Sequence, residues 1–225
     1  MTPVRRVWVT RAEPGAARTA ERLTALGFDP VVAPLLAIRP VAADLGLDGV
    51  TALAFTSRNG VDAFADRSPE RTLPVFTVGD ATAELARARG FGTVRSAQGA
   101  LVDLAGLLVG AAPTGGLVLV PGAKKPAGDL SALLTDRVRV RALPLYEAVE
   151  TGVAAPGRFD AVLVHSARAA RALGALGPFA GARAVALSAA VADALGEGSG
   201  LEIRIARAPD ESALLEALGK PAPRV

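Results

Sequence analysis

Thr56-Ser57-Arg58-Asn59-Gly60-Val61 is the stretch of sequence that decides the fold. The apolar run Ala52-Leu53-Ala54-Phe55 precedes it and has the composition of a buried strand, and a helix-like run follows it. A small hydroxyl side chain at the carboxyl end of a strand, beside the amino end of a helix, is typical of an anion-binding turn. The stretch therefore predicts a strand–turn–helix unit that can hold a negatively charged ligand.

A weaker copy of this unit lies further along the chain, where the apolar run 161–164 is followed by His165-Ser166-Ala167-Arg168. Four pairs of positions match at offsets of 109 to 111 residues: Ser57 and Ser166, Gly79 and Ser188, Leu104 and Leu215, and Val9-Thr10-Arg11 and Val120-Pro121-Gly122. A nearly constant offset favours an internal duplication over the regular rhythm of any alternating α/β chain. Two such turns in two halves suggest that an anionic ligand binds in a cleft between domains.

The composition limits the chemistry that the chain can perform. Its 225 residues have room for two domains of about 110 residues each. The absence of cysteine excludes disulfides, thiolate zinc sites, iron–sulfur clusters and cysteine nucleophiles. The single histidine, His165, excludes multi-histidine metal sites and leaves little room for a Ser-His-Asp triad. The composition therefore offers almost nothing with which to hold a metal.

The charge pattern argues against two classes of partner. The formal net charge is only +3, and the arginines are scattered among acidic residues without a basic block that alternates with aromatics. A nucleic-acid surface is therefore not expected. The sequence contains no apolar run that could span a bilayer and no signal-peptide core near Met1, so we expect a cytoplasmic protein that does not bind membranes.

Short apolar runs alternate with Ala/Leu/Arg-rich runs throughout the chain, which is typical of parallel sheets flanked by helices. Strands are expected over 6–10, 29–33, 52–56, 75–78, 92–96, 117–120, 138–142, 161–165, 184–187 and 202–206. Helices are expected in the gaps, most clearly over 16–26, 80–89, 100–109 and 211–218.

Two segments interrupt this alternation, 35–40 and 143–150, and both have the sequence of extended chain. They could be a pair of antiparallel connecting strands, in which case the first βαβ unit packs with the C-terminal half and residues 41–142 form the other domain. They could also be ordinary surface loops in two consecutive domains. The residues alone leave both arrangements open.

A set of short motifs follows one order along the chain: Val9-Thr10-Arg11, Ala33-Pro34-Leu35, Phe55-Thr56-Ser57-Arg58-Asn59-Gly60-Val61, Val78-Gly79-Asp80-Ala81-Thr82-Ala83, Gly90-Phe91, Val120-Pro121-Gly122, Leu145-Tyr146-Glu147, His165-Ser166 and Ala208-Pro209. In this order and spacing the whole chain resembles the uroporphyrinogen-III synthase family. The resemblance implies two similar flavodoxin-like (Rossmann-like) parallel-sheet domains joined by a two-stranded antiparallel linker. Residues 1–34 and 151–225 would form the first domain, 41–142 the second, and 35–40 and 143–150 the linker.

The resemblance also implies an activity. The family are cyclising carbon–oxygen lyases (hydro-lyases) that close hydroxymethylbilane, a linear tetrapyrrole, to uroporphyrinogen III. They invert ring D through a spiro intermediate and use neither cofactor nor metal. The product leads to haem, sirohaem and cobalamin. On this basis we expect a cytoplasmic monomer with a small-molecule substrate, and a transient hand-over of that substrate from hydroxymethylbilane synthase.

The residues expected in the site combine the resemblance with the rule that open α/β sheets bind ligands at the carboxyl ends of their strands. The resemblance places the family's proton-donating tyrosine at Tyr146, the only tyrosine of the chain. Packing of the linker against a domain is the alternative role for this residue. The residues expected to bind substrate are Arg11, Thr56, Ser57, Arg58, Gly79, Gly122, Ser166, Ala167 and Ser188. For the serines, helix N-capping is the competing explanation.

The chain also departs from the family pattern. A Gly-Pro-Thr-Thr-like turn is replaced by Ser188-Ala189-Ala190, and His165 stands where threonine is usual. Lys124 and Lys125 are the candidates to replace an arginine expected after Pro121-Gly122. The lost threonines keep an alternative open, a non-catalytic two-lobed cytoplasmic binding module for a small polyanion. A nucleotide-binding enzyme is disfavoured, because no strand is followed by G-x-G-x-x-G and Gly122-Ala123-Lys124-Lys125 is no P-loop.

Overall fold

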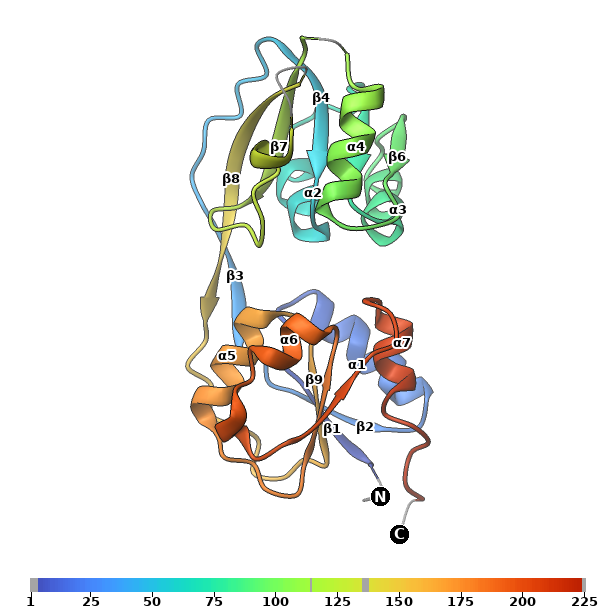
Figure 1. Ribbon diagram of the computed structural model, residues 1–225, viewed down its shortest axis with the longest axis vertical. Helices are drawn as coiled ribbons and strands as arrows, with labels where there is room; N and C mark the ends of the chain where they lie inside the picture. The colour runs from blue at the N-terminus through green and yellow to red at the C-terminus, as the bar shows by residue number, and fades with distance from the viewer. Residues whose placement is uncertain (1–3, 114, 135–137, 224–225) are drawn as a thin grey trace. The chain divides into compact units, whose positions relative to one another are not determined.

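The computed structural model describes residues 4–113, 115–134 and 138–223 (Figure 1). The chain divides into two units. The first consists of Met1–Ile38 with Val149–Val225 and is called the terminal unit below; the second, Arg39–Ala148, is called the central unit. Each unit contains a parallel sheet with helices on both faces, which confirms the predicted α/β class.

The sheet of the terminal unit is built from both ends of the chain. Its five strands, in the order β11-β10-β9-β1-β2, are all parallel to their neighbours. The strands are β1 (Arg6–Val9), β2 (Asp29–Val32), β9 (Ala161–Val164), β10 (Arg183–Ala186) and β11 (Glu202–Ile205). Beyond this sheet the N-terminal and C-terminal segments also meet, because Ala222 N–H donates to the carbonyl of Val4 at 2.8 Å.

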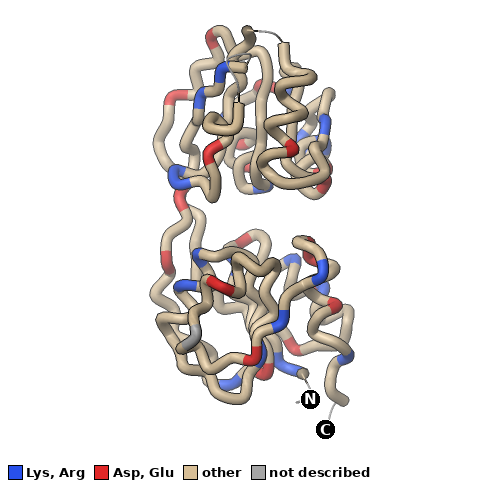
Figure 2. The backbone as a smooth tube through the Cα atoms, in the orientation of Figure 1, with Lys and Arg blue, Asp and Glu red and all other residues tan. Residues whose placement is uncertain are grey.

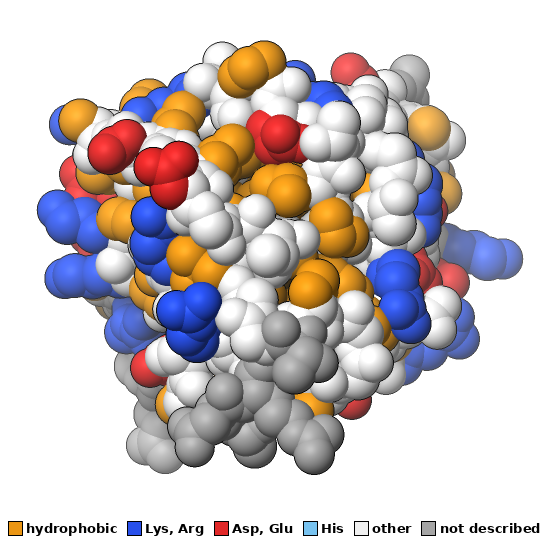
Figure 3. All heavy atoms as spheres, turned by 90° about the horizontal axis from the view of Figure 1, so that it is seen from above, with side chains coloured by type: hydrophobic (Ala, Val, Ile, Leu, Met, Phe, Trp, Pro, Cys, Tyr) orange, Lys and Arg blue, Asp and Glu red, His pale blue; other side chains and the backbone are white. Residues whose placement is uncertain are grey.

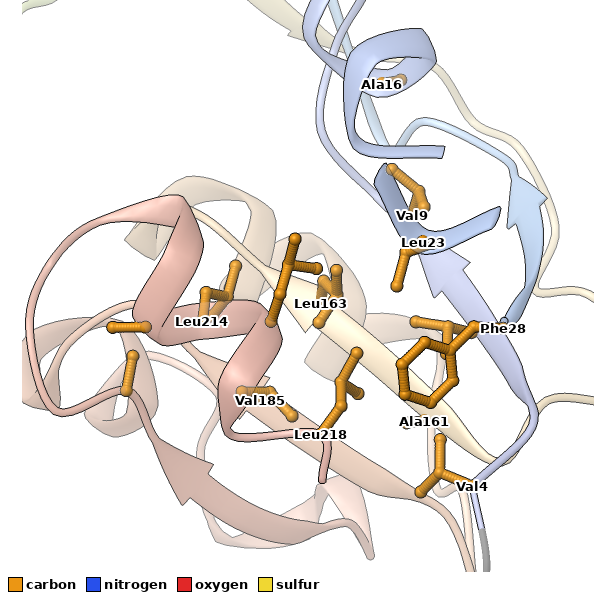
Figure 4. Packing of buried hydrophobic residues seen from close by; sticks show 14 residues of the cluster. Val4, Val9, Ala16, Leu23, Phe28, Ala161, Leu163, Val185, Leu214 and Leu218 are labelled. Atoms are coloured by element: carbon orange, nitrogen blue, oxygen red, sulfur yellow. The ribbon is translucent and has the colours of Figure 1, made fainter. Parts of the chain in front are cut away.

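Two helix pairs cover the two faces of this sheet. Helices α1 (Gly15–Ala25) and α7 (Glu211–Glu216) lie on one face, and α5 (Ala167–Leu176) and α6 (Ala189–Asp193) lie on the other. Figure 4 shows the first layer, in which helix side chains such as Leu214 meet the strands. Burial of such apolar faces supplies most of the stability of an α/β unit.

Alternate residues of β1 serve the two layers, as the period of two in a strand requires. Val7 and Val9 pack under α1 and α7, whereas Trp8 faces the opposite layer. There the indole is fully buried and makes edge contacts with Phe159 and Phe179, at ring-centroid distances of 5.1 and 6.1 Å. The only tryptophan of the chain therefore reports on the core of the terminal unit.

The sheet of the central unit has the strand order β3-β8-β7-β4-β5-β6. Its strands are β3 (Leu36–Pro40), β4 (Val50–Phe55), β5 (Val75–Thr77), β6 (Val94–Ser96), β7 (Leu117–Ala123) and β8 (Arg139–Glu150). Helices α2 (Arg58–Ala65) and α3 (Asp80–Ala88) cover one face, and α4 (Leu101–Ala111) covers the other. Leu53 and Phe55 of β4 pack under α2, while Ala52 and Ala54 face α4.

The chain passes from one unit to the other in β3 and in β8. The long strand β8 joins two segments that the sequence predicted separately, a strand over 138–142 and an extended segment over 143–150. Val41 N–H donates to the carbonyl of Leu145 at 2.8 Å, and Thr151 N–H donates to the carbonyl of Leu35 at 3.1 Å.

The two sheets have the same internal register. In the central unit Leu53 lies opposite Val75, which lies opposite Val94. In the terminal unit the residues 109 positions later, Val162, Ala184 and Ile203, lie opposite one another in the same way. A shared register across three strands is what an internal duplication produces, because a slip of one residue would turn each side chain to the other face.

One connection differs between the two copies. In the terminal unit α1 connects β1 to β2, but the matching connection from β7 to β8 has no α-helix in its described residues, only a 3-10 turn at Ser131–Leu133. The expected helix in this gap is therefore wrong. Pro126 lacks an N–H and Gly128 has a low helix propensity, which explains the irregular path.

Charged residues are interspersed along both units (Figure 2), as the sequence predicts. On the face drawn in Figure 3, lysine and arginine side chains lie mainly toward the left and right, and hydrophobic side chains lie across the middle. No helix in the described part of the chain is long and apolar enough to cross a bilayer.

Candidate functional site

Tyr146 and Ser57 form a hydrogen-bonded pair at the carboxyl edge of the central sheet. The phenol oxygen of Tyr146, on β8, lies 2.8 Å from Ser57 Oγ, which follows β4 and Thr56. Ser57 is also the N-cap of α2, because its hydroxyl accepts the N–H of Gly60 at 3.1 Å. The capping interaction and the Tyr146 contact together fix the position of the hydroxyl.

Gly60 lets α2 lie close to β7. A Cβ at this position would be 2.6 Å from the carbonyl oxygen of Pro121, well inside van der Waals contact. The glycine of the Thr56-Ser57-Arg58-Asn59-Gly60-Val61 stretch thus sets the position of the helix start, and with it the Ser57 hydroxyl.

A pocket of about 350 Å³ opens beside the Tyr146–Ser57 pair. Its lining residues come from the strand ends and from the irregular connection after β7: Thr56, Ser57, Val78, Leu101, Ala123, Pro126, Ala127, Gly128 and Tyr146. A second hollow of about 210 Å³ shares Thr56, Ala123, Pro126 and Gly128 with it and also contains Gly122. Both hollows are lined by the connection from β7 to β8. The terminal unit has the helix α1 at the corresponding place, between β1 and β2.

The phenol of Tyr146 is buried, and this changes its acidity. Burial raises the pKa of Tyr146 above 10.0, while the hydrogen bond with Ser57 partly offsets the rise. Tyr146 is therefore a neutral phenol at physiological pH. In that state it can donate a hydrogen bond or a proton to a group in the pocket.

The other central residues predicted from the sequence lie nearby but in different settings. Arg58 is the half-buried first residue of α2. Gly79 is the N-cap of α3, and its carbonyl accepts the N–H groups of Thr82 and Ala83. Gly122 was expected just beyond a strand that ended at residue 120, but β7 continues through it and pairs Gly122 with Pro144.

In the terminal unit the predicted hydroxyls divide into two cases. Ser166 Oγ accepts the N–H of Ala169 at 3.2 Å and so caps α5, in which Ala167 is the first residue. Ser188 precedes α6, but its side chain makes no capping hydrogen bond. Ser166 therefore has a structural role as the N-cap of α5, whereas the Ser188 hydroxyl does not cap α6.

Arg11 lies in a charged cluster that the sequence did not reveal. Its Nη1 is 2.5 Å from Glu211 Oε2, and Thr19 Oγ1 donates to Glu211 Oε1 at 2.5 Å. His165 Nε2 lies 3.7 Å from Glu211 Oε2, too far for a direct hydrogen bond. Glu211 is 200 residues from Arg11, and the sequence showed it only as part of an amphipathic helix, with no signal for this contact.

The cluster strongly perturbs the acidity of its members. Burial would raise the pKa of Glu211, but the neighbouring His165, the Thr19 hydroxyl and the charge of Arg11 lower it to about 2. Burial lowers the pKa of His165 below 6.5, and Arg11 adds to this effect against the opposing influence of Glu211. Neither ring nitrogen of His165 has a hydrogen-bond partner in the described residues. At neutral pH the cluster therefore contains one cation, one anion and a neutral imidazole.

Comparison with known proteins assigns the chain to a family. The family model described as uroporphyrinogen-III synthase HemD matches residues 17–216. No curated protein sequence matches the chain significantly.

Solved structures share the fold. The crystal structure of uroporphyrinogen-III synthetase from Helicobacter pylori 26695 is 19% identical and has a TM-score of 0.67, with 95% of this chain and 97% of that chain covered. A mutant uroporphyrinogen III synthase from the extremely thermophilic bacterium Thermus thermophilus is also 19% identical, with a TM-score of 0.56 and coverage of 95% and 96%.

Proposed function

The chain belongs to the uroporphyrinogen-III synthase family, and we propose that Tyr146, supported by Ser57, is the proton donor of its cyclisation reaction. Its function is that of a uroporphyrinogen-III synthase in tetrapyrrole biosynthesis. The observation that supports the role of Tyr146 is the 2.8 Å contact between its phenol and Ser57 Oγ at the wall of a pocket.

The reaction begins with loss of the hydroxyl group of hydroxymethylbilane. The carbon–oxygen bond breaks, and a proton from the Tyr146 phenol converts the leaving hydroxide into water. The resulting azafulvene is attacked by the substituted α carbon of ring D, which gives the spiro intermediate. General acids of this kind contribute typically about 10²–10⁴-fold to the rate. Ser57 Oγ can donate a hydrogen bond to the phenolate until the tyrosine is reprotonated.

The enzyme must also choose between two ring closures, because the linear tetrapyrrole closes unaided to the isomer without inversion. A preference of 100:1 requires only about 2.7 kcal/mol of difference between the two barriers. Fixing the orientation of one reacting ring can supply this much. The pocket of about 350 Å³, whose wall contains Tyr146 and Ser57, is the candidate place for the reacting ring of the substrate.

The carboxylates of the substrate require hydrogen-bond donors. In the central unit the candidate is the start of α2, beside Thr56, Ser57 and Arg58, because the amino end of a helix favours an anion. In the terminal unit the candidates are Arg11, the start of α5 at Ser166 and Ala167, and the Ser188 hydroxyl. Gly79 and Gly122 allow close approach of a ligand, because a Cβ at either position would meet no atom within 4 Å.

The direct test is a product assay. Purified protein is incubated with hydroxymethylbilane generated enzymically, and the oxidised products are separated into type I and type III isomers. We expect the type III isomer in excess. Accumulation of the type I isomer alone would contradict the assignment and favour a polyanion-binding module without isomer control.

We also propose that the protein acts as a cytoplasmic monomer and receives its substrate by transient hand-over from hydroxymethylbilane synthase. The spontaneous closure of the substrate supports the hand-over, because a short transit time limits loss to the type I isomer. Light scattering after size exclusion should give the mass of one chain, 22.7 kDa. Adding the purified synthase should raise the type III fraction when the substrate is generated in dilute solution.

A further inference from the structure

Glu211 is a partly buried carboxylate of the terminal unit that the proposed proton transfer does not use. It is the first residue of α7, and its two oxygens contact Arg11, which follows β1, and Thr19 of α1. Only 21% of the Glu211 side chain and 27% of the Arg11 side chain are exposed. Thr19 is fully buried. Three separate elements thus converge on one ion pair at the carboxyl end of β1.

One face of the Arg11 guanidinium packs against the start of α1. A Cβ on Gly15 would lie 2.6 Å from Arg11 Nε, 3.0 Å from Cζ and 3.1 Å from Nη2, so only the bare backbone of a glycine fits under this face. The contacts to Glu211 and Thr19 are both made by Nη1. Within the described ranges neither Nε nor Nη2 makes a hydrogen bond, so the in-plane edge formed by these two nitrogens is left for a carboxylate.

The central unit has no such cluster at the equivalent place. At the offset of 111 residues, Arg11 corresponds to Gly122 and Glu211 corresponds to Ala100. The two copies have therefore diverged. The central unit has a pocket lined by uncharged residues, among them Tyr146, whereas the terminal unit has the Arg11 guanidinium in an ion pair with Glu211.

We propose that Glu211 is a positioning residue for substrate binding. Its carboxylate binds Nη1 of Arg11, so that Nε and Nη2 face a carboxylate of the linear tetrapyrrole. The inference rests on the proposed function, in which Arg11 contacts the substrate and Glu211 acts through it. An arginine fixed before the ligand arrives loses less side-chain entropy on binding than a mobile one. Loss of the Glu211–Arg11 ion pair weakens binding of the substrate in the ground state and leaves the rate of the chemical step unchanged.

Steady-state kinetics of type III formation test this role. Glu211→Gln preserves the shape of the side chain and removes its charge, so KM for hydroxymethylbilane should rise about tenfold while kcat stays within about twofold. The matched control is Glu216→Gln on the same helix. Glu216 pairs with Arg207 at 2.9 Å, and both side chains are exposed. This control should leave both constants unchanged.

A double-mutant cycle shows whether Glu211 acts through Arg11. Arg11→Ala should raise KM at least as much as Glu211→Gln, and the double variant should be no worse than Arg11→Ala alone. Additive effects, or an unchanged KM in Glu211→Gln, would overturn the inference. If Glu211→Gln loses the near-UV circular dichroism of Trp8, Thr19→Val replaces it, with an expected rise in KM of about threefold. An unchanged KM in Thr19→Val would likewise overturn the inference.

The wild-type protein in the same assay separates two kinds of failure. If the wild type yields no type III isomer, the proposed function is wrong. If the wild type yields the type III isomer and the variants have its KM, only the role of Glu211 is wrong.

Discussion

At the residue scale, the chemistry of this protein depends on side chains that burial has changed. Tyr146 is a neutral phenol in the wall of a pocket, because burial raises its pKa and the hydrogen bond with Ser57 only partly offsets the rise. The pKa of Glu211 is lowered to about 2, although burial alone would raise it, because His165, the Thr19 hydroxyl and the Arg11 cation lie beside the carboxylate. The first group suits proton donation, and the second suits permanent ion pairing.

Replacement of Tyr146 by phenylalanine should slow formation of the type III isomer by about 10²–10⁴-fold, the usual contribution of a general acid. The melting temperature should change little, since the ring remains and only one hydrogen bond is lost. Initial rates with isomer analysis and a thermal melt provide the two readouts. Wild-type turnover in this variant would remove Tyr146 from the mechanism.

The single tyrosine also permits a direct titration. Absorbance near 295 nm should show a midpoint above pH 10, because burial raises the pKa of Tyr146. Ser57→Ala should move the midpoint further up, since the Ser57 hydrogen bond opposes that rise. A midpoint that falls in this variant would mean that Ser57 does not stabilise the phenolate.

Stability of the terminal unit should depend on pH through Glu211. The pKa is about 2 in the folded unit and 4.5 in the unfolded chain, so its stabilisation is complete above pH 4.5 and is lost as the pH falls toward 2. The difference corresponds to at most about 3 kcal/mol. Urea unfolding followed by Trp8 fluorescence at pH 6 and pH 3 measures the part that is lost by pH 3, about 2 kcal/mol. Glu211→Gln should show a smaller drop than wild type, and Glu216→Gln the same drop.

At the scale of the elements, two connections determine where the pocket lies. Helix α2 approaches β7 closely enough that only glycine fits at position 60, and the connection after β7 is irregular where its counterpart in the other copy is helical. The close approach of α2 to β7 sets the position of the Ser57 hydroxyl. The irregular connection after β7 leaves the pocket that Ser57 lines. The sequence predicted the turn at Ser57 because hydroxyl and glycine residues have strong local preferences.

Gly60→Ala should destabilise the central unit by about 1–3 kcal/mol, because the new methyl group would meet the Pro121 carbonyl and push α2 away from β7. The matched control is Gly106→Ala in α4, where a Cβ meets no atom within 4 Å. That change should stabilise by about 0.5–1 kcal/mol through helix propensity. Urea unfolding measures both effects, and equal stabilities of the two variants would contradict the close contact.

At the scale of the whole molecule, the sequence predicted the α/β class from local periodicity and the duplicated pattern from matching positions at a nearly constant offset. It could not predict the Arg11–Glu211 pair, whose members lie 200 residues apart, since only the completed terminal sheet brings them together. It also did not show that the connection after β7 lacks an α-helix, although Pro126 and Gly128 were a signal. Tyr146 was identified through a family resemblance, as nothing in its local sequence distinguishes it from a strand residue that packs a linker.

The contact between Val4 and Ala222 makes the terminal unit accessible to protein engineering. Ala222 N–H bonds to the carbonyl of Val4, so a short peptide could join residue 223 to residue 4 without distorting the sheet. A gene rearranged to encode 149–223, the bridging peptide and then 4–38 would produce this α/β unit as one uninterrupted polypeptide. Its affinity for a tetrapyrrole could then be measured apart from the half that carries Tyr146.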